Sequence, residues 1–174
     1  MPGRTVTNSV NERQLRSQAR KLLRNLGYRR TPPPAELCRG LSGQLGVPID
    51  LAGRSLPTVR SFGCVIPFPD KYLITYLTDL SVERQNYTIY HEIAHIFLGH
   101  LDASGTGTPM LCGSLLVDRD APPSGSHYDQ HAEWEAETLG AILSDWSKLP
   151  IRASWADLGR TGEALGSAFG GRGV

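Results

Sequence analysis

At residues 87–100 the chain reads Tyr-Thr-Ile-Tyr-His-Glu-Ile-Ala-His-Ile-Phe-Leu-Gly-His, which contains an H-E-x-x-H motif from His91 to His95. On a helix, residues four apart project from one face, so both imidazoles can reach a single zinc ion. Glu92 lies one step round the helix, where it can take a proton from a water molecule at the metal. The segment therefore predicts a metal-binding helix with a general base beside it.

The apolar residues of the same segment support a helix. Their spacing predicts one buried face, made of Ile89, Ile93, Ile96 and Phe97. Thr88 is a suitable N-terminal cap. The alternative interpretation is a buried helix whose two histidines are satisfied by other hydrogen bonds, and it is disfavoured because the sequence also offers a third ligand.

His100 is the nearest additional donor to the motif. It follows His95 by five residues, which turns it away from the metal-facing side of a helix. We expect it at the helix end, where a donor or cation suits the exposed carbonyl groups.

A better source of the third ligand lies downstream, at residues 131–143. Glu133 and Glu137 share a face beside the apolar positions of a predicted helix, whereas Glu135 points elsewhere. One of the two paired carboxylates can bind zinc, and the other can hold a ligating histidine by its second ring nitrogen. A run of three acids is by itself more often a solvated face, but the preceding H-E-x-x-H segment reverses that preference.

Residues 82–100 and 131–143 resemble the ImmA/IrrE family of metallopeptidases. The family stretch R-x-x-[FY]-T-x-x-H-E-x-x-H-x-x-L-x-H is matched from Arg84 to His100. The family helix E-x-x-A-[ND]-x-[FL]-A is matched from Glu133 onward. The chain departs from that helix at Glu137, where the family has Asn or Asp, and at Gly140, where it has Ala.

The resemblance implies an α+β fold, a zincin-like metallopeptidase domain with a small antiparallel sheet packed on the zinc-binding helix. It implies that Zn²⁺ is held by His91, His95 and Glu133, with Glu92 as the catalytic base. Glu137 stands where the family side chain contacts a ligating histidine from behind. The expected activity is zinc-dependent hydrolysis of peptide bonds in a helix-turn-helix repressor or antitoxin-like partner.

Length and composition suit a single domain with a core, since the chain has 174 residues of which 40% are hydrophobic. We expect this domain over residues 1–150 and a Gly-rich tail over residues 151–174. Three cysteines without a C-x-x-C pair favour a reducing interior. With neither a leader nor a membrane-spanning run in view, we expect a cytoplasmic protein without a membrane partner. These features leave the oligomeric state open.

The first 30 residues hold eight basic side chains and one acidic side chain, a charge of +7, against −6 for the remainder. The stretch from residue 11 to 26 predicts an amphipathic helix, with Leu15, Ala19, Leu22 and Leu26 on one face. The favoured interpretation is a helix that docks by its leucines and solvates its arginines. The alternative is a nucleic-acid contact through residues 1–30.

The rest of the pattern predicts a helix over residues 35–45 ending at Gly46, a strand over 47–51, and a β-hairpin with strands at 63–68 and 71–77. Pro67 places the first hairpin strand at a sheet edge, or ends it. Residues 110–117 can form a short strand or a helical turn within the long segment 102–130. That segment can be a lid or a disordered surface loop.

One more function class remains beside proteolysis and nucleic-acid binding. A regulatory module can keep the zincin-like fold and act on its partner by contact, without cutting it. The presence of Glu92 argues for an enzyme, since a pure binder needs no general base.

Overall fold

The computed structural model describes residues 11–55, 61–101, 110–114 and 130–149. Within these ranges the order of elements is α1 (Glu12–Asn25), α2 (Pro34–Leu45), β1 (Ile49–Arg54), β2 (Ser61–Pro67), β3 (Tyr72–Leu77), α3 (Val82–Leu98), β4 (Met110–Ser114) and α4 (Gln130–Ser147). The α+β class is therefore confirmed. The predicted tail at 151–174 lies outside the described residues, as does most of the segment 102–130. No helix in the described ranges has the length and apolar character needed to span a membrane.

The four strands form one mixed sheet in the order β1-β3-β2-β4. β2 is antiparallel to both β3 and β4, whereas β1 is parallel to β3. The expectation of a purely antiparallel sheet was wrong. The hairpin makes β2 and β3 antiparallel, and β1, which runs opposite to β2, occupies the far side of β3 and so lies parallel to it.

β2 is an interior strand of the sheet rather than an edge strand. β3 lies on one side of it and β4 on the other, with Cys64 opposite both Thr75 and Leu111. Pro67 is the last residue of β2, so its missing N–H ends the strand without interrupting a ladder. Of the two alternatives for residues 110–117, the strand is the one observed, over Met110–Ser114.

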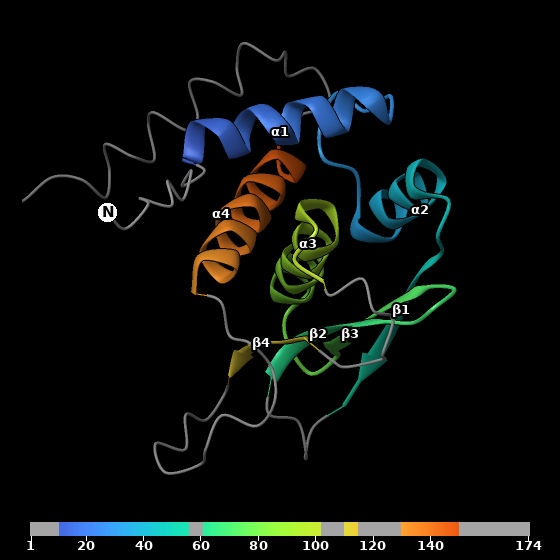
Figure 1. Ribbon diagram of the computed structural model, residues 1–174. Coiled ribbons are helices and arrows are strands. Elements are labelled where there is room, and N and C mark those ends of the chain that lie inside the picture. The colour runs from blue at the N-terminus through green and yellow to red at the C-terminus, as the bar shows by residue number, and fades with distance from the viewer. Residues whose placement is uncertain (1–10, 56–60, 102–109, 115–129, 150–174) are drawn as a thin grey trace, which may run out of the picture.

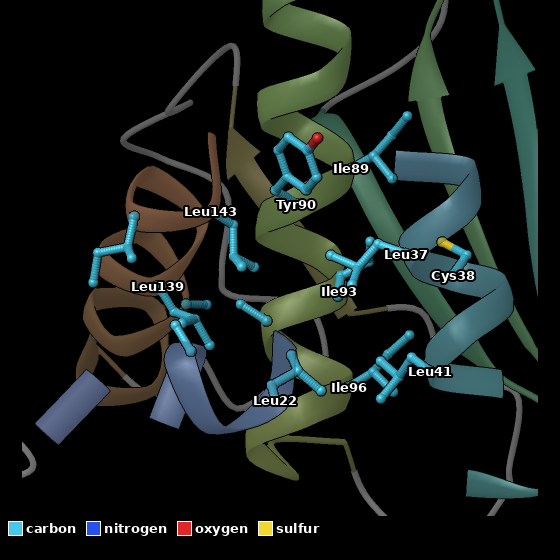
Figure 2. Close-up of a cluster of buried hydrophobic side chains, with 14 of the residues drawn as sticks. Leu22, Leu37, Cys38, Leu41, Ile89, Tyr90, Ile93, Ile96, Leu139 and Leu143 are labelled. Carbon is cyan, nitrogen blue, oxygen red and sulfur yellow. The ribbon is translucent and has the colours of Figure 1, made fainter. Parts of the chain in front are cut away.

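α3 is the central helix of the fold, with α4 along one side, α2 along the other and the sheet beyond its N-terminal part (Figure 1). Figure 2 shows side chains from α2 and α4 converging on α3, around Ile93. The predicted buried positions Ile89, Ile93 and Ile96 are all in the core, and Phe97 packs against it. The helix therefore packs its apolar face between α2 and the apolar residues of α4, while its two histidines face Glu133 in the first turn of α4.

α3 begins two turns before Thr88, so the predicted cap was wrong. Ser81 is the cap residue, and its side-chain oxygen accepts a hydrogen bond from the Arg84 amide at 3.4 Å. The first turns of α3 are largely exposed, so they carry no apolar period that would have marked them as helical. At the other end Gly99 adopts the left-handed conformation, with φ of 73°, and stops the helix just before His100.

α1 docks by its apolar face. Asn11 caps the helix with a reciprocal pair of hydrogen bonds to Gln14. Leu15, Ala19 and Leu22 are buried as predicted, whereas Leu26 is only partly buried. Figure 1 shows α1 crossing α4 on the side away from the sheet.

Candidate metal centre

Three side chains from two helices converge between α3 and α4. His91 and His95 come from α3, and Glu133 comes from the first turn of α4. The Nε2 atoms of the two histidines are 3.1 Å apart. Glu133 Oε2 lies 3.6 Å from His91 Nε2, and Glu133 Oε1 lies 3.5 Å from His95 Nε2. These three residues are a group that could hold a metal ion.

The spacing of the three donors fits tetrahedral coordination. Zinc–nitrogen and zinc–carboxylate bonds are about 2.0–2.2 Å long, and at a tetrahedral angle they separate neighbouring donor atoms by about 3.3 Å. The two Nε2 atoms are 3.1 Å apart, and each of them has a different oxygen of Glu133 at a comparable separation, 3.6 Å for Oε2 and 3.5 Å for Oε1. A three-ligand set of this kind leaves the fourth position open, as catalytic sites require.

Burial keeps one of the histidines in the form that binds metals. His95 is fully buried, and its pKa is lowered to about 3, first by desolvation and then by the neighbouring His91. The ring is therefore neutral at neutral pH. The other two donors, on His91 and Glu133, are each 13% exposed. The donor set is thus closed on the His95 side and open on the opposite side.

On its open side the centre faces a pocket of roughly 300 Å³. Residues of β2, of α3, of the turn before α3 and of α4 line it: Phe62, Gly63, Leu80, Arg84, Tyr87, Thr88, His91, Glu92, Glu133 and Glu137. Two of the potential ligands thus open onto this pocket, and the fully buried Glu92 forms part of its wall.

Gly63 of β2 makes room for the predicted base. Glu92 is fully buried, and a Cβ atom placed on Gly63 would lie 2.6 Å from its Oε1 and in collision with Thr88 Cγ2. Only glycine therefore allows β2 to approach α3 so closely. The sequence offered no sign of this role, because a single glycine inside a strand pattern more often indicates a bulge.

As predicted, His100 lies at the end of α3 and outside the group of three converging donors, and Glu135 points away from Glu133. What the sequence did not predict is that these two residues contact each other and that His100 contacts His95. His100 Nδ1 is 3.1 Å from His95 Nδ1, and His100 Nε2 is 3.0 Å from Glu135 Oε2. Helical spacing does not give the direction of the His100 side chain, because the left-handed Gly99 ends α3 and turns the chain back towards His95. Glu135 does point away from Glu133, but that direction leads to the end of α3 rather than to solvent.

Glu137 lies at the pocket wall and is exposed. The sequence predicted that this carboxylate would support a ligating histidine from behind. In the part of the chain that the structure describes, the ring contact behind His95 is made by His100 instead. Glu137 acts electrostatically on Tyr87, whose pKa is raised by burial and then by this neighbouring carboxylate.

Gly140 sets the distance between the two metal-binding helices. A Cβ atom placed on it would lie 3.0 Å from His91 Cα and 3.1 Å from His91 N. These are backbone atoms of a packed helix, so they cannot move aside as a flexible side chain does. The close approach of α4 to α3 at His91 therefore depends on the absence of a side chain at Gly140.

Replacing Gly140 by alanine is expected to weaken metal binding by roughly tenfold. Overpacking costs about 1–3 kcal/mol, and 1.4 kcal/mol corresponds to about tenfold in affinity. The added methyl group displaces α4 from α3, and Glu133, two turns earlier on α4, moves with it. The measurement is zinc affinity by competition with a chelator, together with thermal unfolding of the zinc-free protein.

Gly43→Ala in α2 is the matched control, because nothing lies within 4 Å of a Cβ atom there. Alanine is a better helix former than glycine by about 1 kcal/mol, so this control should gain stability with unchanged zinc affinity. If both variants gained stability equally and bound zinc equally, Gly140 would not limit the approach of the two helices.

Comparison with known proteins yielded neither a matching protein-family model nor a matching curated sequence.

Proposed function

We propose that this protein is a zinc-dependent endopeptidase of the ImmA/IrrE type with a zincin-like fold. The observation that carries the proposal is the convergence of His91, His95 and Glu133 at a pocket that also contains the buried Glu92. Three ligands with an open position suit a catalytic metal, and an acid that is not one of the ligands suits a general base.

The chemistry of the donors supports zinc as the metal. Two imidazole nitrogens and one carboxylate are the ligand set of many hydrolytic zinc centres. Hard cations such as Mg²⁺ and Ca²⁺ prefer all-oxygen sites, whereas imidazole suits zinc and other transition metals. Zinc bound here would supply a Lewis acid that polarises a carbonyl group and makes a water molecule more acidic.

Glu92 would move the proton during hydrolysis. Its carboxylate accepts a proton from the attacking water and returns it to the nitrogen of the leaving amine. Its burial beside Gly63 holds the carboxylate close to the pocket and away from bulk solvent. His95 is held neutral by burial, so it stays available as a nitrogen donor throughout.

The proposed substrate is a protein, a helix-turn-helix repressor or an antitoxin-like partner. This part of the proposal rests on the resemblance of residues 82–100 and 131–143 to the family. The pocket agrees with a peptide substrate, because it opens beside the metal ligands His91 and Glu133 and also has apolar and aromatic residues in its wall, among them Phe62 and Leu80.

The test begins with the metal. Purified protein is expected to contain about one zinc per chain, and incubation with the repressor encoded by a neighbouring gene should give discrete fragments. Cleavage should stop on chelation and return on adding zinc, with the cut site read by mass spectrometry of the fragments. Fragments that appear equally with and without chelator would contradict a metal-dependent activity.

A further inference from the structure

Behind His95, on the side away from the pocket, four polar side chains form a continuous series of polar contacts. His95 Nδ1 meets His100 Nδ1 at 3.1 Å, and His100 Nε2 meets Glu135 Oε2 at 3.0 Å. The other carboxylate oxygen, Glu135 Oε1, lies 3.3 Å from His131 Nε2. This series of contacts thus runs from the metal centre through the turn after α3 to the first turns of α4.

The direction of the hydrogen bonds follows from the two ends of this series of contacts. At one end Nε2 of His95 faces His91 and Glu133, so it must carry the lone pair if it is to bind a metal. The proton of the neutral ring is then on Nδ1, which donates to His100 Nδ1. His100 consequently carries its own proton on Nε2 and donates it to Glu135 Oε2. With the His95 Nε2 lone pair left for a metal, this arrangement of protons satisfies both contacts of the His100 ring.

We propose that His100 and Glu135 are positioning residues, which fix the ring orientation and tautomer of His95 and thereby present its Nε2 lone pair to the metal. The inference rests on the metal site of the proposed function and adds to it two residues that bind no metal themselves. Groups that hold a ligating histidine by its second nitrogen are commonly worth about 10–100-fold in metal affinity.

The burial of Glu135 and His100 argues against a purely structural role for these contacts. The side chain of Glu135 is 11% exposed and that of His100 is 9% exposed. Burying a carboxylate is costly, and apolar side chains of similar size would pack α4 against α3 as well or better. A buried carboxylate at Glu135 is explained if it acts as the acceptor that sets the direction of the hydrogen bonds.

His131 holds the outer oxygen of Glu135 and should matter less. Its side chain is 49% exposed, and its ring stacks on Trp134 at a centroid distance of 6.1 Å. A contact so open to water competes with solvent, so its loss leaves the His100–Glu135 bond in place. The expected order of effect on zinc affinity is therefore His100 and Glu135 first, then His131.

The experiment compares variants that keep or remove the acceptor for His95. His100→Leu removes it and should weaken zinc binding by about 10–100-fold. His100→Asn places an amide oxygen near the position of Nδ1, so it should restore much of the affinity. Glu135→Leu should resemble His100→Leu, and Glu135→Gln should fall between it and wild type. Asp145→Asn, at an exposed carboxylate near the opposite end of the same helix from Glu133, is the matched control and should change zinc affinity by less than about threefold.

A second readout does not depend on zinc or on proteolysis. Nitrogen-15 chemical shifts of the imidazole rings in zinc-free protein should show His95 as one tautomer, with its proton on Nδ1. The tautomers should become mixed in His100→Leu and single again in His100→Asn, while circular dichroism shows an unchanged fold. Unchanged zinc affinity and an unchanged His95 tautomer in His100→Leu would overturn the inference. Wild-type protein that binds no zinc would contradict the proposed function instead, and the tautomers would still decide the role of His100.

Discussion

Replacing Glu92 by glutamine is expected to reduce peptide-bond cleavage by about 10²–10⁴-fold, the usual worth of general acid–base catalysis. Glutamine keeps the size and the hydrogen-bonding oxygen of the side chain but cannot accept a proton from water. Zinc should remain bound, because the three donors that converge are His91, His95 and Glu133. The fold should also remain intact, since the space that Gly63 leaves for Glu92 accommodates the isosteric amide.

The measurement is paired, with zinc content and partner binding on one side and the rate of fragment formation on the other. Glu83→Gln is the matched control, because it makes the same change on an exposed residue in the first turn of the same helix. It should behave as wild type in both measurements. A Glu92→Gln protein that regulated its partner as well as wild type would show that contact, rather than proteolysis, is the mechanism.

Replacing His95 by alanine is expected to remove zinc from the protein and to abolish cleavage. Two donors would remain, fewer than the three protein ligands that catalytic zinc sites use. His91→Ala should have the same effect, and Glu133→Gln should lower zinc retention more than Glu135→Gln. Glu133 is a candidate ligand, whereas Glu135 acts only through His100.

Elemental analysis after dialysis measures the zinc content, and Glu83→Ala is the control, since Glu83 is exposed in the first turn of α3 and away from the donors. Circular dichroism on each variant separates loss of metal from loss of fold, which matters because His95 is fully buried. Full zinc content in both His91→Ala and His95→Ala would place the metal elsewhere in the chain.

The parts of the site that follow helical spacing could be predicted from sequence. His91 and His95 share a face because they are four residues apart, and Ile89 and Ile93 share the opposite one. A carboxylate on a second amphipathic helix was the natural third donor, and Glu133 is the one that meets the histidines. The hairpin before α3 was also predictable, from two apolar runs separated by Pro69 and Asp70.

The remaining parts depend on contacts that spacing does not encode. His100 follows a helix-ending glycine, so its direction is set by one left-handed residue rather than by the helix. Glu135 is buried because α4 is covered on that flank by the end of α3. The strand β4 lies in a segment rich in Gly, Ser and Pro, and its position beside β2 required the tertiary structure. The clearance at Gly63 likewise appears only when the sheet and α3 are brought together.

The docking of α1 on α4 determines how its basic surface can be studied. Leu15 and Leu22 are fully buried or nearly so, and each contributes on the order of 1.5–3 kcal/mol by burial. Arg30 also donates to the Leu149 carbonyl at 3.0 Å, just beyond the end of α4. Deleting residues 1–30 would therefore uncover α4. A loss of nucleic-acid binding in that variant would reflect this structural damage as readily as the loss of positive charge. Reversing the charge of exposed residues such as Arg13 and Lys21 leaves the leucines in place, and so tests nucleic-acid binding without disturbing the helix that carries Glu133.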